Sequence, residues 1–191
     1  MPGDLAGISR SGQYLYTVDY QYPAGLETSS YEVYLNSLEL IEDKAYLRDR
    51  KMIVPDPGNG KKYDGIGKMA VKDQKAYSVA YRSQCAKDGS DCKYDSDLIT
   101  ADFLDPSNIR FPSSLNLGVE WADIVDLVQG RLFLYAYGGG GAVLVCSLED
   151  PSAPSLLTSL RTGSQPENIK VIEDSTYLSL GMYGVQVIPP N

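Results

Sequence analysis

The segment DQKAYSVAY, residues 73–81, decides the fold, because closely similar segments stand at three other places in the chain. The other copies are GQYLYTVDY at residues 12–20, QGRLFLYAY at residues 129–137 and DSTYLSLGM at residues 174–182. In each copy a polar turn leads into a strand of alternating apolar residues. The equivalent aromatic residues are Tyr16, Tyr77, Phe133 and Tyr177. A segment that recurs in this way indicates a repeat architecture.

Further strands flank each copy. An apolar strand precedes each turn, at residues 5–10, 66–72, 122–128 and 168–173. A third strand ends at Asp43, Asp105 and Asp150, and a fourth strand holds Ile53, Leu115 and Leu160, each ten residues further on. The last copy stops at its third strand, GVQVIPP, residues 184–190. Four antiparallel strands per unit are typical of a β-propeller blade.

The sequence therefore predicts an all-β protein, a β-propeller segment of four consecutive four-stranded blades whose last blade lacks its outer strand. The blades cover approximately residues 5–63, 64–118, 119–166 and 167–191 of one propeller segment, residues 1–191. A two-sheet sandwich is the alternative, although sandwiches do not normally repeat a four-strand unit. The unpaired edge of the last blade predicts that blades one and four do not close a ring, and that a parent chain supplies the remaining propeller blades.

One stretch resembles a known family. GGGAVLVCSLEDPSAPSLLTSLRTG, residues 139–163, is similar to the LVIVP-type repeat of bacterial and archaeal surface propellers, in which a glycine, an apolar strand and a D-P-S-x-P turn precede another apolar strand. DPSN at residues 105–108 matches that turn in part, and EDKAY at residues 42–46 departs from it. The resemblance implies a propeller fold and a secreted or cell-surface binding or scaffolding protein. In such turns we expect Asp105 and Asp150 to accept backbone hydrogen bonds rather than to act in catalysis.

Differences between the copies point to one face of the molecule. The first two copies carry about ten extra residues between strands two and three, and the first carries more between Pro55 and Gly65. Because antiparallel strands reverse direction each time, loops after strands two and four emerge on the same face. Insertions gathered on one face are typical of a binding surface.

Tyrosine and carboxylate residues concentrate on that face, and they suit a glycan or a protein partner. The predicted binding residues are Tyr22, Tyr31, Tyr63, Tyr94, Glu120 and Trp121. Three further tyrosines end equivalent strands, and we expect them to pack blade against blade: Tyr20, Tyr81 and Tyr137.

Composition excludes several functions. The formal net charge of −8 argues against binding to nucleic acid or to an anionic membrane. The absence of histidine removes catalytic triads and histidine-ligated metals. Apolar stretches are too short to insert into a membrane.

Cys85 and Cys92 lie in one polar loop, and we expect them to form a disulfide, which would indicate an oxidising compartment. Two unpaired thiols are the alternative. The loop from Lys87 to Asp97 has the oxygen ligands for calcium, but its spacing is not that of an EF-hand, so a solvated acidic loop is the preferred interpretation. No other cofactor is expected.

These observations predict a non-enzymatic, extracytoplasmic β-propeller module that binds or scaffolds a protein or glycan. The alternative is a glycoside-processing propeller enzyme that uses paired carboxylates, for which Glu120, Asp123 and Asp126 are the candidates. No catalytic residue is assigned, because the sequence does not show two of these carboxylates converging.

Overall fold

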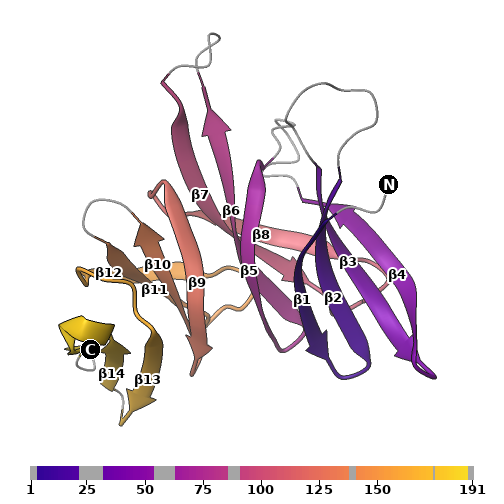
Figure 1. Ribbon diagram of the computed structural model, residues 1–191. Helices are drawn as coiled ribbons and strands as arrows, with labels where there is room; N and C mark the ends of the chain where they lie inside the picture. Colours follow the sequence, from indigo (N-terminus) through magenta and orange to yellow (C-terminus); the bar gives the residue numbers. More distant parts are fainter. Residues whose placement is uncertain are drawn as a thin grey trace.

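The computed structural model describes residues 4–21, 32–53, 63–85, 91–137, 141–173 and 175–188 (Figure 1). These residues form β-strands and one short 3-10 helix, η1 (Gly181–Tyr183). The predicted all-β fold is confirmed. No helix in the described part of the chain is long and apolar enough to cross a membrane.

The strands form four separate antiparallel sheets, each made of strands that are consecutive in sequence. The first sheet holds β1 (Asp4–Ser11), β2 (Tyr14–Gln21), β3 (Glu32–Ile41) and β4 (Lys44–Met52). The second holds β5 (Gly65–Lys72), β6 (Lys75–Gln84), β7 (Lys93–Asp102) and β8 (Arg110–Asn116). The third holds β9 (Trp121–Val128), β10 (Arg131–Tyr137), β11 (Ala142–Ser147) and β12 (Ser155–Arg161). The fourth holds β13 (Asn168–Ile172), β14 (Ser175–Ser179) and β15 (Val185–Ile188).

This grouping reproduces the strand units predicted from the repeats. Within the described residues, the first three sheets have four strands and the last has three. The two-sheet sandwich does not form.

Tight hairpins join the first two strands of the second and third sheets. Asp73 and Gln74 have φ values of 48° and 61°, and Gln129 and Gly130 have values of 48° and 73°. Two successive residues with positive φ are typical of type I′ turns, whose twist matches that of the flanking strands. The polar turn at the start of the second and third repeats therefore sets the register of the hairpin.

The two D-P-S turns fold alike. The Asp105 side chain accepts a hydrogen bond from the Ser107 N–H at 3.0 Å, and the Asp150 side chain accepts one from the Ser152 N–H at 2.9 Å. These are the Asx turns expected of aspartate before proline and serine. The predicted role of both aspartates as turn formers is confirmed.

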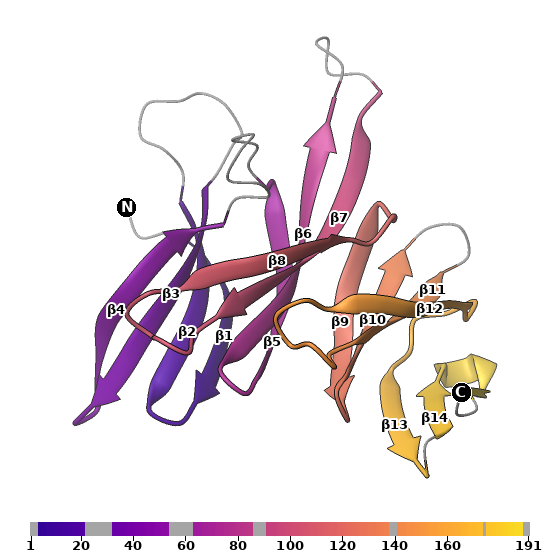
Figure 2. The same cartoon turned by 180° about the vertical axis from the view of Figure 1, so that it is seen from behind.

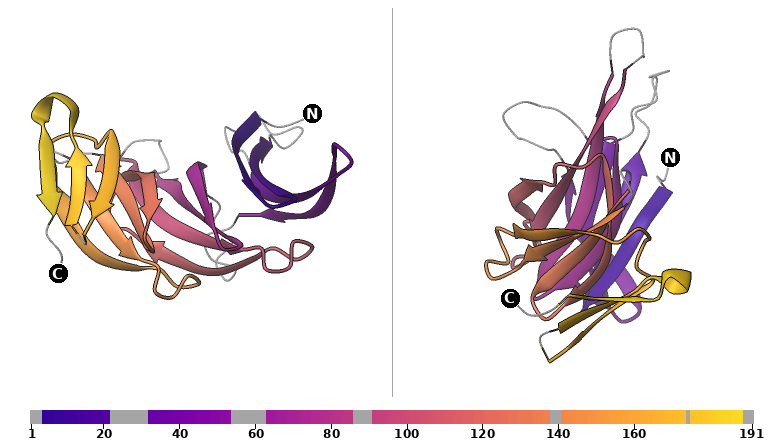
Figure 3. Two further views of the ribbon diagram at one scale, coloured as in Figure 1. Left: turned by 90° about the horizontal axis from the view of Figure 1, so that it is seen from below. Right: turned by 90° about the vertical axis from the view of Figure 1, so that its left-hand side faces the viewer.

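The first strands of the sheets lie side by side in the order β1, β5, β9, β13 (Figure 1). Seen from behind, β8 and β12 lie nearest the viewer (Figure 2). The sheets follow one another along an arc, with the first and last sheets at its two ends (Figure 3). No closed ring forms among the described residues.

Apolar layers hold neighbouring sheets together. The faces of β2 and β3 pack on the second sheet, those of β6 and β7 on the third, and those of β10 and β11 on the fourth. The mid-strand aromatics lie in these layers and are fully buried: Tyr16, Tyr77 and Phe133. Tyr77 also donates a hydrogen bond to the Pro151 carbonyl of the next sheet at 3.1 Å, so an aromatic residue of one sheet contacts a turn of its neighbour.

The last sheet has no sheet beyond it among the described residues. Tyr177, at the position equivalent to Tyr77, is only partly buried. Val185 and Val187 lie opposite Ser179 and Tyr177 and are exposed. The face that packs on a neighbour in the first three sheets is therefore uncovered in the fourth.

Candidate functional site

The ends of several strands gather at one edge of the molecule. Gln21 at the end of β2 pairs with Glu32 at the start of β3, and the Ile53 N–H after β4 donates to Val33 O at 2.9 Å. The Tyr20 hydroxyl donates to Ile66 O at 2.9 Å, which joins the end of β2 to the start of β5. The strand ends that flank the predicted insertions therefore share an edge, which we call the loop edge. Most of the insertions themselves lie outside the described residues.

An aromatic cluster stands at this edge. Trp121, the first residue of β9, lies 4.7 Å from Tyr81 of β6 and 5.0 Å from Tyr94 of β7, measured between ring centroids. Trp121 is 36% exposed. Side chains from two sheets thus meet in one aromatic surface that solvent reaches.

The segment before Trp121 is held in place by Ser96. Its hydroxyl donates to Glu120 O at 2.9 Å, its N–H donates to Val119 O at 3.0 Å, and its carbonyl accepts from Leu117 N–H at 3.0 Å. Ser96 is fully buried. A buried residue with this many partners fixes the backbone that leads into β9.

A cleft of about 410 Å³ runs beside the cluster, along the first strands of sheets two and three. Its lining residues are Ile66, Gly67, Tyr81, Trp121, Ala122, Asp123 and Tyr137. We call it the aromatic cleft. It continues into a cavity of about 720 Å³ whose charged lining residues are Lys68, Asp123 and Glu167.

Asp123 and Tyr137 form the polar part of the aromatic cleft. The Tyr137 hydroxyl donates to Asp123 Oδ2 at 3.0 Å, and Tyr137 is 40% exposed. Burial, together with this hydrogen bond to a carboxylate, raises the pKa of Tyr137. Tyr137 therefore stays protonated and keeps the Asp123 carboxylate in position.

Glycines on β5 make room for these side chains. A Cβ at Gly67 would lie 2.6 Å from Asp123 Oδ1, and a Cβ at Gly65 would overlap the Tyr81 hydroxyl. Any larger residue would displace Asp123 or Tyr81. The two glycines thus leave room for the Asp123 carboxylate and the Tyr81 ring to lie against β5.

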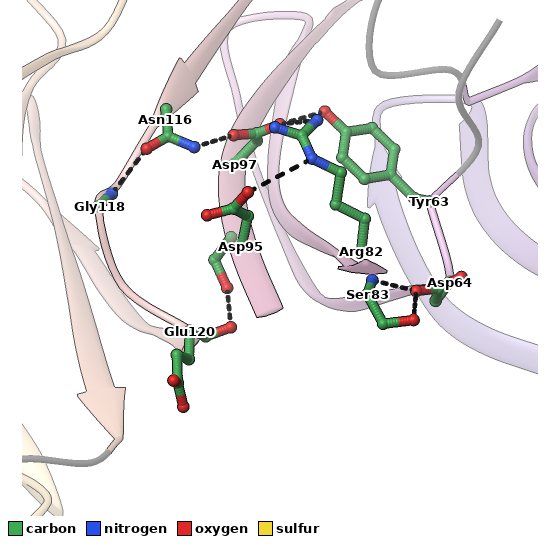
Figure 4. A network of polar contacts seen from close by, with 10 residues as sticks. Tyr63, Asp64, Arg82, Ser83, Asp95, Asp97, Asn116, Gly118 and Glu120 are labelled. Carbon is green, nitrogen blue, oxygen red and sulfur yellow. Dashed lines mark hydrogen bonds and ion pairs between the residues drawn. The ribbon is translucent and has the colours of Figure 1, made fainter. Parts of the chain in front are cut away.

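A buried polar network supports the loop edge from beneath (Figure 4). Asp97 of β7 accepts hydrogen bonds from the Tyr63 hydroxyl at 2.9 Å and from Asn116 at 2.8 Å, and it pairs with Arg82 Nη1 at 2.9 Å. Burial, reinforced by the Asp97 carboxylate, raises the pKa of Tyr63 well above its ordinary value. Asp95 lies further out, 3.8 Å from Arg82 Nε. The network ties three strands of the second sheet to the segment before β5.

The predicted binding residues reach different places. Trp121 and Tyr94 lie in the aromatic cluster, and Glu120 is exposed beside them. Tyr63 is 2% exposed and donates its hydroxyl hydrogen to Asp97, so it belongs to the buried polar network, and its role in binding stays a prediction. Tyr22 and Tyr31 lie outside the described residues.

The strand-end tyrosines also differ from one another. Tyr20 packs on the next sheet through Ile66, as predicted. Tyr81 also packs on the next sheet, because its ring lies 4.7 Å from that of Trp121, and it lines the aromatic cleft as well. Tyr137 lines the cleft and donates to Asp123 of its own sheet. The usable signal was the glycines of β5, since a small residue opposite a large aromatic marks a close approach.

Cys85 and Cys92 form the predicted disulfide, with a Cα–Cα separation of 3.9 Å. Asp95 and Asp97, which the sequence analysis assigned to the same loop, lie on β7 and pair with Arg82. Within the part of the chain that the structure describes, no group of three or more acidic or cysteine residues is arranged to hold a metal ion.

The three carboxylates considered for glycoside cleavage do not all line the aromatic cleft. Of the three, only Asp123 lines the aromatic cleft. Asp126 accepts a hydrogen bond from the Leu127 N–H at 2.7 Å, and Glu120 is exposed. The cleft therefore offers aromatic faces and one carboxylate from this group.

A scan against protein-family models gives no match, and neither does a search of curated proteins.

Proposed function

We propose that the four sheets are successive blades of a β-propeller and that the protein is a non-enzymatic, extracytoplasmic module that binds a protein or a glycan. The order of the strands, the adjacency of β1, β5, β9 and β13, and the arc of the sheets support the propeller. The resemblance of residues 139–163 to LVIVP-type repeats supports both the fold and the compartment.

The uncovered face of the fourth sheet supports further blades as partners. Burying Tyr177, Val185 and Val187 would repeat the packing made by the equivalent faces of the first three sheets. Each fully buried aliphatic side chain contributes about 1.5–3 kcal/mol. We propose that blades supplied by a parent chain cover this face.

A disulfide on the loop edge supports the extracytoplasmic assignment, because such bonds persist in oxidising compartments. Cys146, the third cysteine, is buried, and burial raises its pKa to about 11. A thiol of that kind is inert, so it does not compete with the disulfide.

The aromatic cleft carries the binding proposal. Trp121, Tyr81 and Tyr137 come from different strands and converge on one hollow beside a carboxylate. Concave sites with aromatic walls and few polar groups are typical of ligand pockets. Aromatic faces stack on sugar rings and also bury the side chains of a protein partner.

The test uses Trp121, which is the one tryptophan in the chain. Neutral oligosaccharides and short peptides of varied charge are titrated while its fluorescence is recorded. We expect at least one class to change the emission saturably, and Tyr81→Ala to weaken that binding at least tenfold. Tyr46→Ala is the matched control, because Tyr46 is an exposed tyrosine of β4 that does not line the cleft. Equal binding by Tyr81→Ala and wild type would rule out this cleft.

A further inference from the structure

The aromatic cleft contains a carboxylate, that of Asp123. Binding through aromatic faces alone would not require this negative charge. Tyr137 uses Oδ2, while Oδ1 lies beside Gly67. No ion pair between described residues involves Asp123. Its negative charge therefore faces the cleft without a cationic partner from the described chain.

No described cationic side chain forms an ion pair with Asp123. Lys68 lines the adjoining cavity, but among the described residues no ion pair joins Lys68 to Asp123. Glu167 lines the same cavity and adds a second negative charge. The chain as a whole carries a formal net charge of −8, which attracts cations over a longer range.

The aromatic walls favour the same kind of ligand. Cations bind over aromatic faces within about 6 Å of the ring centroid, and tryptophan is the best such face. Trp121 and Tyr137 are both solvent-accessible and line the cleft with Asp123. The aromatic wall can pack against the flat apolar part of an organic cation. The Asp123 carboxylate, which has no ion pair among the described residues, can bind its positive charge.

We propose that the aromatic cleft binds an organic cation, a guanidinium or ammonium group, with its charge on Asp123 and its apolar surface against Trp121. This rests on the proposed binding function and narrows its ligand. The group belongs either to an arginine or lysine side chain of a protein partner or to a free small-molecule amine. The chemistry of recognition is the same in both cases.

The experiment follows Trp121 fluorescence in the full chain with matched probes. N-acetyl-arginine amide is compared with N-acetyl-citrulline amide, which has nearly the same shape but no charge. We expect the arginine probe to bind at least tenfold more tightly. We also expect its affinity to fall as salt is raised, because screening weakens the charge interaction. A tripeptide with a central arginine and choline form two further arms. Tighter binding of the peptide indicates a protein source, and tighter binding of choline indicates a small-molecule source.

Asp123→Asn tests the carboxylate directly. The amide oxygen of asparagine still accepts the Tyr137 hydrogen bond, so the fold is retained, as unfolding in urea will check. We expect this variant to bind the arginine probe at least tenfold more weakly. Asp126→Asn is the control, because Asp126 stands on the same strand but hydrogen-bonds its own segment of backbone. It should leave the affinity unchanged.

Two results would overturn the proposal. Equal binding of the arginine and citrulline probes, or an unaffected Asp123→Asn variant, removes the charge from recognition. Binding of a neutral β-linked oligosaccharide without binding of any cationic probe removes the cation but keeps the cleft as a binding site. Failure of every oligosaccharide, peptide and cation to change Trp121 emission counts against the proposed function as well.

Discussion

Two rows of aromatic residues run through the repeats four positions apart, and they have different environments. Tyr16, Tyr77 and Phe133 lie mid-strand and are fully buried between sheets. Tyr20, Tyr81 and Tyr137 lie toward the ends of the same strands; Tyr20 and Tyr81 are partly buried and Tyr137 is 40% exposed. Aromatic residues on the same face of a strand thus serve packing throughout the first row, whereas two members of the second row, Tyr81 and Tyr137, also line a cleft.

The two rows differ because they contact different parts of the neighbouring sheet. The mid-strand row meets apolar side chains and turns of the next sheet, such as Phe103, whose ring centroid lies 3.8 Å from that of Tyr16. The strand-end row meets the loop edge, where Gly65 lies against Tyr81 and Asp123 lies against Tyr137. Repetition therefore maintains the core, and departures from it create the candidate site.

We expect the largest effect on stability from a substitution in the mid-strand row. Tyr77→Ala removes a fully buried ring and its hydrogen bond to Pro151, and we expect a loss of about 4 kcal/mol in the free energy of unfolding. Tyr81→Ala, in the strand-end row, should cost about 1–2 kcal/mol, because its ring is only partly buried. Urea denaturation of both variants measures the difference. Similar losses would show that the two rows are energetically equivalent.

The next effect concerns the polar network beneath the loop edge. Asp97→Ala leaves Arg82 and Tyr63 without their shared partner, and we expect a loss of about 3 kcal/mol. Asp95→Ala is the matched control, because Asp95 is half exposed and 3.8 Å from Arg82, and it should cost less than about 1 kcal/mol. Urea denaturation again serves as the measurement. If Asp95→Ala were the more costly change, the buried network would not be what holds the edge.

Repetition explains how much of the fold the sequence could predict. Four similar segments, alternating strands and the D-P-S turns were enough to place every sheet, because each sheet is local in sequence. The Asx turns at Asp105 and Asp150 follow from residue chemistry alone. The propeller itself stays a proposal, since blade geometry depends on how sheets pack rather than on how strands pair.

The site was less predictable, because its residues belong to different sheets. Trp121 and Tyr94 were predicted from composition near the insertions, whereas the burial of Tyr63 could not be predicted, because its partner Asp97 is 34 residues away. Tyr81 and Tyr137 were expected in the core by analogy with their repeats. What separates them from core residues is the local opening at Gly67 and Asp123, which no repeat alignment displays.

We expect the smallest effects on stability from removing one tyrosine hydroxyl in each row. At neutral pH, Tyr77→Phe should cost about 1 kcal/mol, because the Pro151 carbonyl loses a buried hydrogen bond. Tyr137→Phe should cost at most about 0.5 kcal/mol, because water can replace its hydroxyl at Asp123.

Alkaline pH separates the two rows more finely. Burial, with smaller contributions from Asp73, Asp150 and Asp102, raises the pKa of Tyr77 from 10.0 to about 12. Below pH 10 the residue is protonated in both folded and unfolded states, so its contribution to stability is constant. Between pH 10 and pH 12 the unfolded chain loses this proton while the folded chain keeps it, so the free energy of unfolding falls. Tyr77→Phe has no hydroxyl to ionise and should lose about 1 kcal/mol less than wild type over this range. Urea unfolding of wild type, Tyr77→Phe and Tyr137→Phe at each pH measures the slopes, and the other buried tyrosines contribute equally to all three proteins. A wild-type slope matched by Tyr77→Phe but not by Tyr137→Phe would place the stronger pKa shift in the strand-end row and reverse the comparison.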